Sequence, residues 1–333
     1  AVGVIGVTAL LPSFYLLDRA PVAAAPKPSA SRTIDPDWLK NDPLWLDRLI
    51  TKLVPEVTPN ATMDDLTVPL DLVRGDLPEV NEDGCHAERM DNEPTKRCFY
   101  GDTSSKKIIA LFGDSHAAQW VGGLNDAAIA QGYQLWPRTR ASCPAANVTS
   151  YLPENKQAYT SCDTWRLSVL KELRHAGVQM VIICNQKPLY LFDRKTHQMV
   201  TNQKAVTKLW RAGMERTIQQ LTEVGIHVLV VRDVPQWPTD LPECLANAAK
   251  PIDCAQRTQS LLESADEDSN IAKAMPHANG IDLTNAICGE QNCYPIRGGV
   301  VLARDRAHLT RTYSHLLGTL WQALIVHELQ RKA

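Results

Sequence analysis

The stretch Lys107-Ile-Ile-Ala-Leu-Phe-Gly-Asp-Ser-His116 joins an apolar run to a tight turn and the start of a helix. Its unbroken run Ile108–Phe112 is typical of a strand buried in a parallel sheet. A Gly-Asp pair interrupts the run, and Ser115 then precedes a predicted helix over 117–131. Open α/β sheets bind their ligands at the carboxyl ends of the strands. We therefore predict that the Ser115 hydroxyl is exposed there, beside backbone N–H groups that stabilise negative charge.

The alternative interpretation of this turn is structural. Asp114 and Ser115 are both residue types that cap helices, and strand-turn-helix units are common. Position alone favours a cap, but the complete Gly-Asp-Ser-His string is more specific. Average composition produces it by chance in roughly one chain of this size in several hundred. On so tight a turn, the His116 side chain is expected to point away from that of Ser115.

Size and composition are those of a globular protein without a nucleic-acid partner. The 333 residues are 44% hydrophobic and carry a formal net charge of −2. No Gly-rich phosphate loop of the common types is present. A chain of this length holds one large α/β domain with extensions, or two small domains.

The nine cysteines indicate disulfides and an oxidising compartment. Cys184 ends an apolar run and is expected to be a buried free thiol. Zinc is the rival interpretation, but no Cys-x-x-Cys spacing or clustered His supports a metal site. The other eight lie in loop-like segments, and their proximity in sequence predicts four bridges: Cys85–Cys98, Cys143–Cys162, Cys244–Cys254 and Cys288–Cys293.

The chain divides into four expected segments. Residues 1–17 carry no charge and are interpreted as the end of a transmembrane helix that begins upstream. A buried N-terminal helix is the alternative. Residues 18–36 have the Ala/Pro/Ser-rich composition of a linker. Residues 37–104 are expected to form a helical and loop extension, and residues 105–330 the main domain.

Strands and helices alternate in the main domain, which predicts a parallel sheet with helices on both faces. The fold class is therefore α/β, a three-layer αβα sandwich with a central parallel sheet and an N-terminal helical extension. The segment 235–298 is expected to be irregular. Strands are expected at 107–113, 133–138, 178–184, 226–232 and 299–303, and helices at 117–131, 160–176, 202–224 and 308–330.

A base for Ser115 is predicted near the C-terminus. A serine hydroxyl becomes a good nucleophile when a base, usually a His oriented by a carboxylate, takes its proton. Asp305-Arg-Ala-His308 follows the expected last strand, and so falls at the same strand-end face as Ser115. Asp83 and His86 repeat this spacing but precede the sheet. The structural alternatives are a helix cap for Asp305 and a first-turn surface residue for His308.

These motifs resemble the SGNH hydrolase superfamily. Gly113-Asp-Ser-His116, followed far downstream by Asp305-x-x-His308, is most similar to one group: the extracytoplasmic SGNH domain fused behind a membrane acyltransferase-3 domain in bacterial envelope O-acetyltransferases. Arg140-Ala-Ser-Cys-Pro144 resembles the cysteine-containing second block of such domains. The resemblance covers about residues 105–330. It implies an SGNH/flavodoxin-like fold on the extracytoplasmic side of the cell membrane.

The resemblance also implies a role for each site residue. Ser115 is the expected nucleophile, His308 the base and Asp305 the residue that orients it. The Ser115 backbone N–H is expected in the oxyanion hole, together with a Gly of the second block and an Asn of the third. An Ala-Ser pair stands where that Gly is expected, at 141–142. Asn185 is the candidate for the Asn, with a polar residue of a strand-end turn as the structural alternative.

The function implied is extracytoplasmic O-acetyl transfer. Ser115 would accept the acetyl group and pass it to a hydroxyl of a cell-envelope glycan or glycolipid. The acetyl group would come ultimately from acetyl-CoA through the membrane acyltransferase-3 domain of the same chain, and the SGNH domain itself would bind no cofactor or metal. Two alternatives remain: an acetyl esterase that uses the same triad, and a non-catalytic glycan-binding domain.

Overall fold

A computed structural model describes residues 42, 44–91, 96–154, 156–262 and 267–331. The expected transmembrane end at 1–17 and the linker at 18–36 lie outside these residues. Within the described ranges, no helix combines the length and the hydropathy that crossing a membrane requires.

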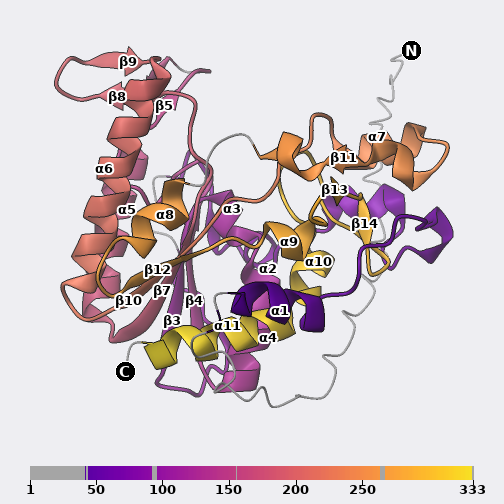
Figure 1. The fold of residues 1–333 in the computed structure, drawn as a ribbon. Helices are drawn as coiled ribbons and strands as arrows, with labels where there is room; N and C mark the ends of the chain where they lie inside the picture. The colour runs from indigo at the N-terminus through magenta and orange to yellow at the C-terminus, as the bar shows by residue number, and fades with distance from the viewer. Residues whose placement is uncertain (1–41, 43, 92–95, 155, 263–266, 332–333) are drawn as a thin grey trace, which may run out of the picture.

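One seven-stranded sheet lies at the centre of the molecule (Figure 1). Its strands are β1 (His86–Ala87), β2 (Tyr100–Gly101), β3 (Ile108–Gly113), β4 (Gln134–Arg140), β7 (Val178–Cys184), β10 (His227–Val231) and β12 (Ala278–Ile281). The order is β1-β4-β3-β7-β10-β12, and every neighbouring pair on this path is parallel. β2 pairs antiparallel with β4. Because β3 is central, the turn after it lies in the middle of the strand-end edge.

Helices cover both faces of the sheet (Figure 1). Side chains of α1, α4, α10 and α11 enter the core on one face, and those of α5, α6 and α8 enter the core on the other. This arrangement confirms the three-layer α/β class. The helices are α1 (Trp45–Leu53), α2 (Glu79–Glu82), α3 (Ser115–Ala118), α4 (Val121–Gln131), α5 (Thr160–His175), α6 (Gln203–Thr222), α7 (Leu241–Asn247), α8 (Glu267–Lys273), α9 (Thr284–Ile287), α10 (Arg311–Leu316) and α11 (Gly318–Arg331).

The apolar run of β3 supplies both cores. Ile109 and Leu111 pack into the core of one face, whereas Ala110 and Phe112 pack into that of the other. Successive side chains of a strand point to opposite faces, so a strand that is covered on both sides is apolar throughout. This is the physical reason why residues 108–112 carry no polar side chain.

The prediction that the last expected strand, at 299–303, belongs to the main sheet is wrong. Val300–Val301 does not join the main sheet but pairs antiparallel with Ile296–Arg297 in a separate hairpin. Gly298 and Gly299 at the turn both have positive φ, 60° and 73°, and these values favour a tight reversal of the chain. The strand that does complete the sheet is β12, which lies in the segment that was expected to be irregular. Its sequence, Ala-Asn-Gly-Ile, is too short and too polar to predict a strand.

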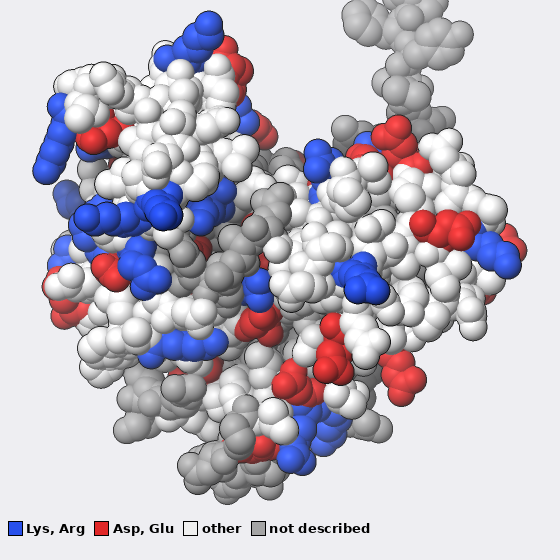
Figure 2. Space-filling view, turned by 45° about the horizontal axis from the view of Figure 1, so that its top comes forward, with Lys and Arg blue, Asp and Glu red and all other residues white. Residues whose placement is uncertain are grey.

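Shorter elements make up the rims of the fold. Four two-stranded sheets pair β5 (Tyr151–Leu152) with β6 (Gln157–Ala158), β8 (Leu191–Asp193) with β9 (Gln198–Val200), β11 (Gln256–Arg257) with β13 (Asn292–Cys293), and β14 (Ile296–Arg297) with β15 (Val300–Val301). Short 3₁₀ helices are η2 (Met63–Asp65), η3 (Leu70–Gly75), η4 (Pro251–Cys254) and η5 (Thr258–Leu261). On the face shown in Figure 2, acidic and basic side chains are both present, and Lys and Arg gather on the side formed by α6.

All four predicted disulfides are present, and Cys184 is a buried free thiol. The bridges join residues that are only 13, 19, 10 and 5 positions apart. Each therefore fastens a loop or a helix start locally. None of them connects distant strands of the sheet.

Candidate active site

The turn after β3 positions Ser115 through the glycine before it. A Cβ at Gly113 would clash with the Cys184 carbonyl of the neighbouring strand β7. Asp114 is almost fully buried, and its carboxylate accepts hydrogen bonds from the backbone N–H of His116, at 2.9 Å, and of Gln186, at 3.0 Å. These contacts fix the turn to the end of β7. Asp114 thus caps α3 and shapes the turn, and Ser115 is the first residue of that helix.

Ser115, His308 and Asp305 lie in one chain of hydrogen bonds. His308 Nε2 is 2.9 Å from Ser115 Oγ, and His308 Nδ1 is 2.8 Å from Asp305 Oδ2. A carboxylate only accepts hydrogen bonds, so Nδ1 carries the proton and Nε2 accepts from the serine hydroxyl. The sequence placed these three residues at one edge of the sheet, and the structure brings them into contact across a separation of 193 residues.

The loop that carries His308 is held at several points, although it does not follow a strand of the main sheet. Asp305 Oδ1 accepts from the backbone N–H groups of Ala307 and His308, both at 2.8 Å. The Leu309 backbone N–H donates to Gln119 Oε1 at 2.7 Å, which ties the loop to the segment between α3 and α4. The loop conformation thus fixes the imidazole opposite Ser115. Helix formation begins only after it, at Arg311.

The surroundings of the triad favour an ionised Asp305 and a neutral His308. Burial alone would raise the pKa of Asp305, but the hydrogen bond from His308, with further contributions from the Ala307 backbone N–H and the charge of Arg304, holds it far below its usual range. For His308, burial is the largest influence and lowers the pKa, and the charge of the nearby His116 lowers it further. The hydrogen bond to Asp305 opposes both effects. A neutral imidazole is the form that can accept the serine proton.

His116 makes contacts that the sequence did not predict. Its Nδ1 lies 2.6 Å from Asp233 Oδ1, and its ring lies 4.6 Å, centroid to centroid, from that of His308. The His116 ring thus lies beside the ring of the proposed base. Its expected direction away from the Ser115 side chain stays a prediction. The available signal was Asp233, which follows the apolar run Val228–Val231 and therefore falls at the same strand-end edge.

The comparison with known proteins assigns the fold to a family. A family model described as the SGNH domain fused to AT3 domains matches residues 84–323. The chain belongs to this family. The structure is also similar to the periplasmic domain of the lipopolysaccharide acetyltransferase of Salmonella ser. Paratyphi A, with a TM-score of 0.51 and 19% identity over 77% of this chain and 94% of that one. At that identity the likeness concerns the fold. A search of curated proteins gave no match.

In the SGNH domain, Asn185 follows β7 beside the turn that carries Ser115, since a Cβ at Gly113 would lie 3.1 Å from Asn185 Oδ1. Its side chain is 2% exposed. Its Oδ1 accepts from the Ala145 backbone N–H at 2.7 Å, and its Nδ2 lies 3.6 Å from Met214 Sδ. These contacts hold the loop after the second block against β7. A role for Asn185 in the oxyanion hole stays a prediction, as does that of the Ser115 backbone N–H.

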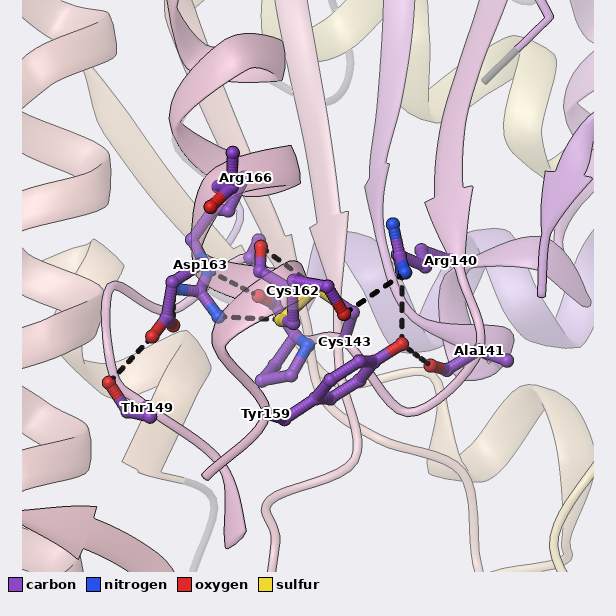
Figure 3. Close-up of a disulfide and its surroundings, with 12 residues drawn as sticks. Arg140, Ala141, Cys143, Thr149, Tyr159, Cys162, Asp163 and Arg166 are labelled. Carbon is purple, nitrogen blue, oxygen red and sulfur yellow. Dashed lines mark hydrogen bonds and ion pairs between the residues drawn. A yellow bond between two sulfur atoms is a disulfide. The ribbon is translucent and has the colours of Figure 1, made fainter. Parts of the chain in front are cut away.

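The second block of the SGNH domain is held by a disulfide and a buried arginine (Figure 3). Cys143–Cys162 joins the block to the first turn of α5. Arg140, which is buried, donates from Nε to the Tyr159 hydroxyl at 3.0 Å, and the Tyr159 hydroxyl donates to the Ala141 carbonyl at 3.2 Å. The Ala-Ser pair is therefore fixed in place by its neighbours, although neither residue has the freedom of the family's glycine.

The rival Asp-x-x-His pair does not form. His86 Nδ1 lies 2.9 Å from Thr139 Oγ1, while Asp83 Oδ2 accepts from the Tyr100 hydroxyl at 2.8 Å. Burial, with a smaller influence from His308, lowers the pKa of His86 to about 4. His86 is thus a neutral neighbour of the site. No cluster of metal-ligating side chains is found among the described residues.

Proposed function

We propose that this SGNH domain is a serine-dependent O-acetyltransferase that acts on a cell-envelope glycan or glycolipid outside the cytoplasm. The observation that carries the proposal is the hydrogen-bonded order Asp305–His308–Ser115 at the carboxyl ends of the parallel strands. Membership of a family described as fused to AT3 domains supports a membrane acyltransferase-3 domain as the partner. That domain would deliver the acetyl group, ultimately from acetyl-CoA.

The first half of the reaction forms an acyl-enzyme. Ser115 Oγ attacks the carbonyl carbon of the donor acetyl group while His308 Nε2 takes the hydroxyl proton. The bond between the carbonyl carbon and the donor's leaving atom then breaks, and His308 gives its proton to that leaving group. Asp305 keeps the imidazole in the required tautomer and stabilises the transient imidazolium.

The second half transfers the acetyl group to the acceptor. An acceptor hydroxyl attacks the carbonyl carbon of acetyl-Ser115 and gives its proton to His308 Nε2. The bond to Ser115 Oγ breaks, and the proton returns to that oxygen. Side chains of His308 and Asp305 are 22% and 32% exposed, so water can reach the site in this structure. This observation favours an acetyl esterase as the second candidate, since water can replace the acceptor.

Labelling with a fluorophosphonate tests the nucleophile. We expect the protein to be labelled, Ser115→Ala to abolish labelling, and His308→Ala to slow it by about 10²–10⁴-fold. Absence of labelling in correctly folded protein would contradict the proposal and favour a glycan-binding domain. An activated acetyl ester then separates the two enzymes. A transferase gives acetylated acceptor when an envelope glycan is added, whereas an esterase gives acetate alone.

A further inference from the structure

A second buried His–carboxylate pair lies next to the triad. The His116 side chain is 1% exposed, and its Nδ1 is 2.6 Å from Asp233 Oδ1. Its Nε2 is buried and makes no hydrogen bond within the described part of the chain. Asp233 also accepts from the Val234 backbone N–H at 2.8 Å, so its carboxylate is fixed at the end of β10. The reaction proposed above does not use this pair.

The pair holds a positive charge in the interior. Burial alone would lower the pKa of His116, but the charge and hydrogen bond of Asp233, with smaller contributions from Asp114 and Asp305, raise it to about 9. His116 is therefore an imidazolium at neutral pH. Three carboxylates, those of Asp233, Asp114 and Asp305, favour this charge.

The charge reaches the proposed base through direct ring contact. The rings of His116 and His308 are 4.6 Å apart between centroids and inclined at 53°. The other groups that influence His308 are Asp305 and Arg304 from its own loop, and His86, which is neutral, lies beside it on β1. Asp305 favours the protonated form of His308, whereas His116 and Arg304 oppose it. His116 is the opposing cation whose ring contacts the base.

We propose that His116, held by Asp233, is a positioning residue that presents a buried positive charge to His308 and so keeps this base neutral and active in mildly acidic conditions. The inference rests on the function proposed above. Its physical basis is that a like charge at this distance disfavours a second charge on the neighbouring ring. The same contact would make the transient imidazolium of His308 a stronger acid, which favours return of its proton to the leaving group.

The sign of the expected effect follows from the base being active when neutral. Removing the His116 charge raises the pKa of His308, so the acidic limb of the pH–rate profile moves to higher pH. In His116→Gln we expect the midpoint of the acidic limb, measured from the fluorophosphonate labelling rate as a function of pH, to rise by about 0.5–1 pH unit. In Asp233→Asn, His116 loses the carboxylate that keeps it charged, and we expect a smaller shift in the same direction.

His227→Gln is the matched control. His227 is also buried and also pairs with a buried carboxylate, since its Nε2 is 3.0 Å from Glu328 Oε2. It begins β10, at the opposite end of the strand from Asp233. For His227→Gln we expect a lower melting temperature and an unchanged acidic limb of the pH–rate profile. If His116 had only a structural role, His116→Gln would give the same result. That result would overturn the inference.

A histidine NMR titration separates this inference from the proposed function. The pKa of His308 is read from its ring resonances, in the unchanged protein and in His116→Gln or, if that variant does not fold, in Asp233→Asn. A higher pKa of His308 in the variant supports the coupling, and an unchanged pKa overturns it. If the unchanged protein is not labelled at all, the proposed reaction fails, while the titration still decides whether His116 acts on His308.

Discussion

The proton on Nδ1 of His308 determines whether Ser115 can be activated. Asp305 accepts hydrogen bonds from the N–H of His308 Nδ1 and from two backbone N–H groups of the same loop, so its carboxylate sets both the tautomer and the shape of the loop. An amide in its place can donate to Nδ1 and stabilise the opposite tautomer. Nε2 would then carry a proton and could not accept one from the serine.

The first variant that tests this is Asp305→Asn. We expect it to fold and to lower the fluorophosphonate labelling rate by about 10³–10⁴-fold. Asp240→Asn is the control, because Asp240 caps α7 through the Glu243 backbone N–H and an asparagine caps a helix equally well. Equal labelling rates for the two variants would show that Asp305 acts only as a loop cap.

Strands whose side chains are buried on both faces were predictable, because they are apolar along their whole length. The apolar runs of β3, β7 and β10 indicated buried parallel strands, and each is a strand of the central sheet. β12 was not predicted because it contains a buried polar residue, Asn279. The Asn279 Nδ2 donates to Glu328 Oε1 at 2.8 Å, and a partner so distant in sequence leaves no local pattern. Val300–Val301 is apolar and was assigned to the sheet, but the two glycines before it turn the chain into a hairpin.

In the candidate site, too, some residues were predicted from the sequence and one contact was not. Ser115, Asp305 and His308 were predicted because each belongs to a short motif next to an expected strand end. The contact of His116 with Asp233 was not, because it joins residues 117 positions apart and depends on the direction in which a tight turn sends one ring. The Ser115–His308 contact was predicted from its motifs, although the strand expected before Asp305 belongs to a separate hairpin.

The turn after β3 gives a prediction for an element. Gly113→Ala adds a methyl group against the Cys184 carbonyl, and its Cβ would also lie 2.9 Å from that of Ala117. We expect a loss of roughly 1–3 kcal/mol in the free energy of unfolding and a strong decrease in labelling, since the turn must shift. Gly75→Ala is the control, because nothing lies within 4 Å of the added Cβ. A Gly113→Ala protein with unchanged stability and labelling would contradict the account of the turn.

Across the molecule, the segment before the family match is part of the folded unit. The match begins at residue 84, yet Leu49 and Ile50 of α1 lie in the same core as β3. Polar contacts fix α1 and the residues after it: Asn285 Nδ2 donates to Asp47 Oδ1 at 3.1 Å, and Arg297 Nε donates to the Pro55 carbonyl at 2.6 Å. The stability of the SGNH domain therefore depends on residues that its family model does not include.

Leu49→Ala tests this dependence. Leu49 is fully buried, and truncation should lower the free energy of unfolding by about 2–5 kcal/mol in a denaturant titration. Leu44→Ala, at a side chain that is 55% exposed beside the same helix, should change it by less than about 0.5 kcal/mol. Similar small effects for both variants would mean that α1 is not part of the cooperative unit.

The short span of each disulfide bears on how the chain acquires its bonds. Partners are 5 to 19 residues apart, and the four spans neither overlap nor enclose one another along the sequence. A polypeptide that emerges N-terminus first into an oxidising compartment exposes both thiols of one couple before the first thiol of the next. Correct pairing can then proceed in the order of synthesis, without an isomerase to sort the 105 possible connectivities of eight cysteines.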